Sequence, residues 1–192
     1  MRKLGALSAL IALCLATSAM ARAAPASAGP GDARAETDLG LRYEKERDYA
    51  RAAALYRKAA SRGYAEAQFN LGVLFECGRG TAQSYGQAVA WYRKAADQGV
   101  AAAQMSLGAF YANGLGVTQD YAQAVAWYRK AADQGNAHAQ GALGTMYLLG
   151  WGIAEDREQA LFWLRKAAAQ GNEAAENVLR TLGQGAAAGR NI

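Results

Sequence analysis

Hydrophobic and polar side chains recur along most of the chain with a period of 36 residues. The pattern forms three copies in register and a shorter related unit before them, which cover residues 65–100, 101–136, 137–172 and 33–64. In the second half of a copy, small and aromatic side chains fall at the spacing of one helix face, for example Ala88, Trp91, Tyr92 and Ala95. The glycine-rich segment before them favours a turn. Each copy therefore predicts two helices joined by a glycine loop.

The ends of the predicted second helices carry capping residues at equivalent positions. A side chain that can accept a hydrogen bond precedes each helix: Asp48, Ser84, Asp120 and Asp156. In the three full copies a glutamine follows three positions later and completes a capping box. Each second helix ends at a glycine suited to the left-handed C′ position: Gly63, Gly99, Gly135 and Gly171.

A glycine also stands in the middle of each predicted first helix: Gly40, Gly72, Gly108 and Gly144. Glycine costs a helix interior roughly 1 kcal/mol relative to alanine. Its recurrence predicts that the partner helix packs closely at that point. Because no single helix pair can bury its apolar face alone, we expect the pairs to stack as a solenoid.

Composition supports an all-helical body. Hydrophobic residues make up 52% of the 192 positions, and about half of them are alanine. The two prolines, Pro25 and Pro30, precede the repeats, and β-branched residues are too sparse for a β-sandwich or an α/β sheet. One histidine and two cysteines exclude a multi-ligand zinc cluster and a disulfide framework, so we expect neither a metal nor a cofactor.

The N-terminus has the pattern of a secretory signal peptide. Arg2 and Lys3 precede an apolar run over 4–16, and Ala19-Met20-Ala21 fits a signal peptidase site. The run is too short to span a ~30 Å hydrocarbon core, so we expect a cleaved segment over 1–21 rather than a membrane span. This predicts a periplasmic or secreted protein, with a flexible linker over 22–32. A net charge of +5 that falls on cleavage is no argument for nucleic-acid binding.

The sequence resembles the Sel-1-like repeat over about residues 33–182, through the pattern A-x-A-Q-x-x-L-G-x-x-Y, then G-x-G, then A-x-x-W-Y-R-K-A-A-x-Q-G. The shorter first unit is nearer to the related tetratricopeptide spacing. The resemblance implies an all-α, right-handed superhelical solenoid of antiparallel helix pairs. It also implies a scaffold or adaptor, because exported bacterial members resemble receptors, secretion factors and regulators of envelope signalling. After the third full copy, residues 173–183 predict a C-terminal capping helix, and 184–192 predict a disordered tail.

Catalytic chemistry is poorly represented in the sequence. His138 is the only imidazole, and no serine or cysteine has an evident base partner. The Gly78-Arg79-Gly80 segment recurs in later copies, which favours an inter-helix turn over a dinucleotide site. Some cysteine-rich relatives of the resembled family are linked to β-lactam chemistry, but this chain has no recurring cysteine pair. We expect a non-enzyme, with an envelope hydrolase of β-lactam or cell-wall type as the alternative.

Positions that differ between copies are candidates for partner recognition. In helix-pair solenoids the first helices line the concave face, which predicts a groove for a protein or peptide formed by Arg34, Leu41, Glu44, Glu66, Phe69, Val73, Glu76, Met105, His138 and Leu148. These side chains could instead contact the next repeat and bind nothing. Trp151, between two loop glycines, is a further candidate contact, whereas the repeated Trp91, Trp127 and Trp163 indicate core positions.

Each second helix also ends in an arginine-lysine pair: Arg57-Lys58, Arg93-Lys94, Arg129-Lys130 and Arg165-Lys166. These charges interact favourably with the helix C-terminal dipole and can remain a solvated outer face. Alternatively they form a basic ridge that binds an anionic wall polymer or an acidic partner.

Overall fold

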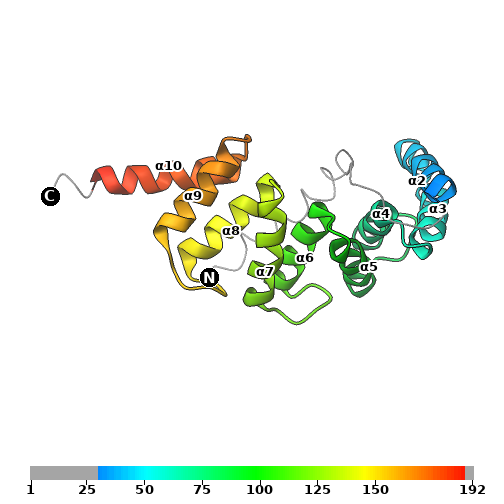
Figure 1. Ribbon diagram of the computed structural model, residues 1–192, viewed down its shortest axis with the longest axis horizontal. Coiled ribbons are helices and arrows are strands. Elements are labelled where there is room, and N and C mark those ends of the chain that lie inside the picture. The colour runs from blue at the N-terminus through cyan, green and yellow to red at the C-terminus, as the bar shows by residue number, and fades with distance from the viewer. Residues whose placement is uncertain (1–29, 189–192) are drawn as a thin grey trace. The chain divides into compact units, whose positions relative to one another are not determined.

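A computed structural model describes residues 30–188, and in that range the chain forms nine α-helices and no strand (Figure 1). The predicted all-α repeat fold is confirmed. The signal peptide expected over 1–21 and its cleavage site lie outside the described residues. The helices are α2 (Pro30–Lys45), α3 (Tyr49–Ser61), α4 (Ala65–Cys77), α5 (Tyr85–Asp97), α6 (Ala101–Asn113), α7 (Tyr121–Asp133), α8 (Ala137–Leu149), α9 (Arg157–Ala168) and α10 (Glu173–Ala188).

The described chain divides into two compact units, with the boundary inside α6 at Ala103. The first unit contains α2 to α5 and the loop Asn113–Thr118, and the second contains the rest of α6 and α7 to α10. None of the described helices is long and apolar enough to cross a bilayer.

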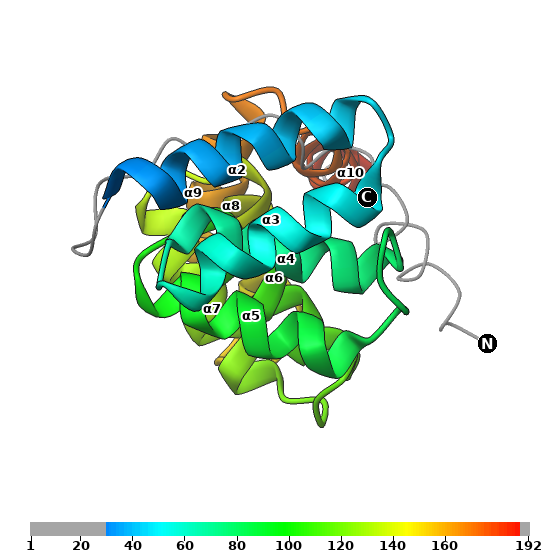
Figure 2. The same cartoon turned by 90° about the vertical axis from the view of Figure 1, so that its right-hand side faces the viewer.

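In the first unit, consecutive helices α2, α3, α4 and α5 pack against one another in chain order, as Figure 2 shows. Their shared core is built largely from small side chains of α3 and α4, with Tyr56 as its largest fully buried member. A Cβ atom on Gly40 would lie 2.5 Å from the Tyr56 ring, and one on Gly72 would lie 2.7 Å from the Tyr92 ring. The predicted close approach of the two helices in each pair is thus confirmed.

The second unit repeats this arrangement. A Cβ atom on Gly108 would lie 2.5 Å from the Tyr128 ring, and one on Gly144 would lie 2.8 Å from Cγ of Leu164. Helix α10 packs against α9 through Val178, Leu179 and other apolar side chains. A helix thus covers the end of the α8–α9 pair, as expected for a capping element.

The predicted helix caps are present, with one difference. The side chains of Asp48, Ser84, Asp120 and Asp156 each accept a hydrogen bond from the amide three residues later. The predicted capping box would place the glutamine side chain on the N-cap amide. Those amides instead donate to carbonyl oxygens of the preceding helix, as Ser84 donates to Phe75 at 2.9 Å and Asp120 to Tyr111 at 2.9 Å. The caps therefore connect the two helices of a pair.

Buried glutamines connect neighbouring helices in the same way. In α4, the Gln68 amide donates to the carbonyl of Ala60 in α3 at 3.2 Å and accepts from Gln98 at the end of α5 at 2.7 Å. Equivalent pairs join Gln134 to Gln104 at 2.7 Å and Gln170 to Gln140 at 2.8 Å. Because the amide is both donor and acceptor, one side chain satisfies groups on two other helices.

The two outer helices extend beyond their predicted limits. Helix α2 begins at Pro30 rather than at residue 33, because proline is compatible with the first helical turn, where no backbone donor is needed. Helix α10 continues to Ala188 rather than ending at 183, so the expected tail is helical over 184–188. The alanine run Ala186–Ala188 explains this extension, since alanine has the highest helix propensity.

Candidate functional site

The exposed face of the first helices carries side chains that differ from copy to copy. We use the name first-helix face for two positions in each copy. One stands six residues before the central glycine, and the other stands directly after that glycine. In the first unit these are Arg34 and Leu41 on α2 and Glu66 and Val73 on α4. Arg34 is exposed and the other three are half-buried. All four were predicted to form part of the groove.

Charged groups gather at one end of this face. Burial raises the pKa of Glu66, and the negative charge of Asp38 raises it further, whereas a hydrogen bond from Tyr64 and the nearby Arg34 lower it. Burial likewise raises the pKa of the Tyr64 hydroxyl. Two carboxylates and one guanidinium from α2 and α4, and the phenol of Tyr64 directly before α4, thus lie close to one another.

Three predicted groove residues are buried instead of exposed. Phe69 is 2% exposed, with its ring centroid 5.7 Å from that of Tyr92, while Glu76 is 6% exposed and Met105 is also buried. Phe69 and Met105 stand three residues before the central glycine, and Glu76 stands four residues after it. Those positions turn toward neighbouring helices, because each first helix has packing partners on more than one side. Their assignment to an exposed groove was wrong.

Glu44 and Glu76 each pair with a buried tyrosine; Glu44 is half-buried and Glu76 is buried. The Tyr56 hydroxyl donates to Glu44 Oε2 at 2.7 Å, and the Tyr92 hydroxyl donates to Glu76. Burial raises the pKa of Glu76. In the later copies the same two positions hold Ala112 with Tyr128 and Leu148 with Leu164, so the pair becomes progressively apolar. The glutamates therefore accept hydrogen bonds from the hydroxyls of tyrosines whose rings fill the space beside the glycines.

In the second unit, α8 carries the equivalent face. His138 is exposed, and its Nδ1 lies 3.4 Å from the Nδ2 atom of Asn172 at the start of α10. Thr145 follows the central glycine and donates to the carbonyl of Gly141 at 3.0 Å. Leu148 is half-buried. The two predicted α8 residues, His138 and Leu148, are therefore accessible to different degrees.

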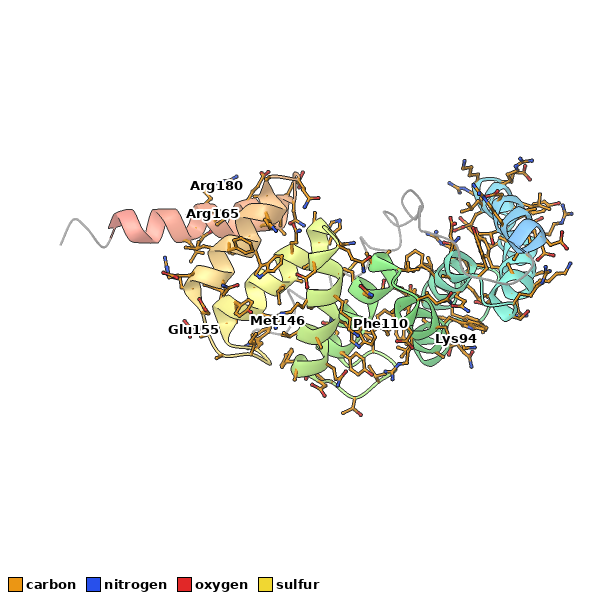
Figure 3. All side chains as sticks on the ribbon, in the orientation of Figure 1. Lys94, Phe110, Met146, Glu155, Arg165 and Arg180 are labelled. Carbon is orange, nitrogen blue, oxygen red and sulfur yellow. The ribbon has the colours of Figure 1, made fainter. Side chains whose placement is uncertain are left out.

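The second helices present lysines over tryptophan rings. The ammonium groups of Lys94 and Lys130 each lie 3.9 Å from the ring centroids of Trp91 and Trp127, and Lys166 lies 5.2 Å from that of Trp163. Figure 3 labels Lys94 on α5 and the exposed Arg165 on α9. These lysines are thus engaged by their own helix through cation–π contacts.

The arginines and tryptophans of the second helices differ in part from their predicted roles. Arg129 donates to the hydroxyl of Tyr147 in α8, so part of the predicted basic ridge ties consecutive repeats together. Of the three tryptophans predicted as core, Trp127 is buried, but Trp91 and Trp163 are only half-buried. The fully buried ring of α5 is the next residue, Tyr92.

Trp151 is exposed, as predicted, but one side of its ring is covered. Its ring stacks on Tyr121, the first residue of α7, with centroids 5.1 Å apart and planes inclined by 25°. In the first unit the equivalent loop residue, Arg79, lies over the ring of Tyr49 at 5.3 Å. Sequence reasoning missed this contact, although an aromatic residue recurs at the start of α3, α5 and α7. The middle residue of each loop therefore lies where the preceding repeat can support it.

The Sel1 repeat model matches residues 33–64, 65–100, 101–136 and 137–172. The shorter first unit, predicted to be nearer the tetratricopeptide spacing, is thus matched by the same model as the others. Among curated protein sequences no significant match is found.

Solved structures of bacterial repeat proteins are similar to this chain. A protective antigen present in uropathogenic Escherichia coli strains, which displays an SLR fold, is 41% identical with a TM-score of 0.75; the match covers 78% of this chain and 33% of that one. A Sel1 repeat protein from Oxalobacter formigenes is 32% identical with a TM-score of 0.72, covering 77% and 62%. Cysteine rich protein B of Helicobacter pylori is 26% identical with a TM-score of 0.51, covering 64% and 93%.

This chain therefore spans about a third of the length of the E. coli antigen and about three fifths of the Oxalobacter protein. Sel1 repeat proteins generally mediate protein–protein interactions and are typically non-enzymatic scaffolds. The four matched intervals cover most of the sequence. On these grounds the chain belongs to the Sel1 repeat family.

Proposed function

We propose that this chain is an exported scaffold or adaptor of the bacterial cell envelope, and that it binds a peptide or protein segment through the first-helix face. The observation that carries the proposal is a contrast between buried and accessible positions. The central glycines that let the helix pairs pack closely recur in every copy, whereas Arg34 and Glu66 occupy equivalent positions, exposed and half-buried respectively, with opposite charge. A scaffold that repeats while its accessible face varies is the arrangement expected for recognition.

The chemistry of the face in the first unit supports a polypeptide ligand. Leu41 and Val73 offer half-buried apolar contacts, and the charged groups around Glu66 lie at one end of the same helices. An apolar centre flanked by polar groups is the usual anatomy of a protein interface. In the later copy the equivalent positions hold His138 and Thr145, so each unit offers different side chains to a ligand.

Site-specific photo-crosslinking tests the assignment of the face. A photoreactive amino acid in place of Val73 should form a covalent adduct with the partner in the native host. The matched control is the same residue in place of Ala90, which is exposed on α5 of the same unit. Adducts from position 90 with none from position 73 would overturn the proposal. The added variant Arg34→Glu should reduce the yield at position 73, because it reverses a charge on the same face.

Export is supported by the pattern of Arg2, Lys3 and the following apolar run, together with the small residues up to Ala21. A 41% identical E. coli protein is described as a protective antigen, and by likeness to it we infer an accessible location for this chain. Intact-mass measurement of protein from the native host should show a chain that begins near Arg22. An unprocessed chain recovered from the cytoplasm would refute export.

A further inference from the structure

The loop between α8 and α9 departs from the two equivalent loops before it at its accessible positions. Its middle residue is Trp151, where the earlier loops hold Arg79 and Leu115. Trp151 is 45% exposed, and nearby Leu149 at the end of α8 is 46% exposed. Large apolar side chains exposed together in this way commonly mark an interaction surface.

The indole of Trp151 is held in a defined position. Gly150 and Gly152 on either side adopt left-handed conformations, with φ of +64° and +70°. The Trp151 amide donates to the carbonyl of Met146 at 3.1 Å, and the ring stacks on Tyr121. One face of the indole is therefore covered, and its exposure leaves the opposite face open to solvent.

The same loop has exchanged a structural amide for a carboxylate. In the earlier loops, Gln83 donates to the carbonyl of Glu76 at 2.8 Å and Gln119 donates to the carbonyl of Ala112 at 2.7 Å. The equivalent residue here is Glu155, labelled in Figure 3, which cannot donate this bond when ionised. The Cβ atom of Glu155 lies 3.6 Å from the position that a Cβ on Gly150 would occupy, and Gly150 directly precedes Trp151 in the chain.

Among the described residues, Trp151 differs from the other tryptophans because no cationic side chain lies over its ring. The other three tryptophans each have a lysine ammonium over the ring. Within residues 32–183, where side chains are described, no lysine or arginine lies over Trp151, and Glu155 forms no ion pair or hydrogen bond. An open indole face beside an uncompensated carboxylate favours a cationic group, through cation–π attraction and charge pairing.

We propose that Leu149, Trp151 and Glu155 form a docking surface for a lysine- or arginine-bearing segment of a partner protein. The cation lies on the open face of the indole, its charge is paired with Glu155, and its aliphatic stem contacts Leu149. This surface shares no residue with the first-helix face. The proposal therefore holds or fails independently of the function proposed for that face.

A nuclear magnetic resonance titration of the full chain tests the proposal. The four tryptophans give separate indole N–H signals, and the variant Trp151→Leu identifies the signal of Trp151 by its loss. The probe is a short acetylated peptide with two lysines among glycines and serines, and the control peptide has glutamine in place of lysine. The Trp151 signal should shift saturably with the lysine peptide and stay in place with the glutamine peptide.

Two variants take residues from other loops of the chain, so their fold should be preserved. Glu155→Gln, which restores the residue of the earlier loops, should weaken binding of the lysine peptide about two- to fivefold, the range for an exposed ion pair. Trp151→Leu should weaken it about tenfold, read from the backbone amides of Gly150 and Gly152. Glu158→Gln, a change of an exposed carboxylate on α9, is the matched control and should leave binding unchanged.

An absent shift, equal shifts with both peptides, or unchanged affinity in Glu155→Gln would each overturn the proposal. A response to both peptides that is lost only in Trp151→Leu would indicate an uncharged peptide ligand instead. Raising the salt concentration should weaken binding of the lysine peptide, because the exposed charges are screened.

Discussion

Single residues decide how closely the helices of each pair approach. The clearest case is Gly72, whose missing Cβ leaves room for the ring of Tyr92. The ring is fully buried, and its hydroxyl reaches Glu76 one helical turn further along α4. Glycine in a helix interior is unfavourable, so its presence is explained by the ring that occupies the space rather than by the helix itself.

Gly72→Ala should lower the free energy of unfolding even though alanine is the better helix former. A Cβ atom 2.7 Å from the buried Tyr92 ring forces a shift that costs up to about 3 kcal/mol, against a gain of ~1 kcal/mol in helix propensity. Gly86→Ala is the control, because Gly86 is helical with nothing within 4 Å of its Cβ position. It should raise the free energy of unfolding by up to about 1 kcal/mol. Denaturant unfolding followed by circular dichroism measures both, and equal effects would contradict the packing account.

Glu76 makes stability depend on pH in a defined direction. Burial raises its pKa in the folded protein above the ordinary value of 4.5, despite the hydrogen bond from Tyr92. The stabilisation that Glu76 contributes to the folded protein is therefore fully present below its unfolded-state pKa. This stabilisation is lost as the pH rises through the higher folded-state pKa. Relative to Glu76→Gln, the wild-type chain should lose free energy of unfolding as the pH rises from about 4 to 7. A constant difference between the two proteins across this range would show that the carboxylate is not desolvated.

At the scale of elements, the glycine loops join one repeat to the one before it. A Cβ on Gly80 would lie 2.2 Å from the carbonyl oxygen of Tyr49, and one on Gly152 would lie 2.2 Å from the carbonyl carbon of Tyr121. Each loop therefore packs directly on the backbone at the start of the preceding second helix. These contacts, and the N-cap amides bonded across each helix pair, complement the contacts between helix faces.

Gly152→Ala should be more destabilising than Gly150→Ala. Both glycines have similar positive φ, so both substitutions carry the left-handed penalty of roughly 1–2 kcal/mol. Only a Cβ on Gly152 would overlap backbone atoms, at 2.2 Å from the carbonyl carbon of Tyr121, because the nearest atom to a Cβ on Gly150 is 3.6 Å away. Thermal unfolding of the two variants measures the difference, and equal losses would show that the loop does not depend on contact with α7.

The sequence predicted the positions of the helices well, because capping residues and glycines are local signals. It predicted poorly which side of a helix is buried, because that depends on residues distant in the sequence. Caps and glycines depend on a few neighbouring residues, so their repetition located the helices. The choice between Trp91 and Tyr92 as the buried ring depends on which neighbour each one meets, and the repeat spacing is the same for both. Phe69 was misplaced for a similar reason, since a first helix has partners on several sides and periodicity alone does not rank them.

At the scale of the molecule, the chain combines a repeated scaffold with accessible positions that do not repeat. Part of the arginine-lysine ridge belongs to the scaffold, since Lys94 covers Trp91 and Lys58 pairs with Glu36 at 2.6 Å. The bond from Lys58 is the main reason that the pKa of Glu36 is lowered. The side chains of the first-helix face form fewer ion pairs and cation–π contacts within the chain. This difference is why the partner is assigned to the first-helix face rather than to the ridge.

The affinity of the crosslinked partner for two double variants tests this assignment most directly. Arg34→Glu with Val73→Asp alters only the first-helix face and should weaken binding by about tenfold or more, the size of a hot-spot loss. Arg57→Ala with Arg93→Ala alters only the ridge and should change binding less than about twofold, because exposed charges are screened at physiological salt. Circular dichroism should show unchanged helicity in both. The reverse order, with binding abolished by the ridge variant and retained by the face variant, would contradict the account.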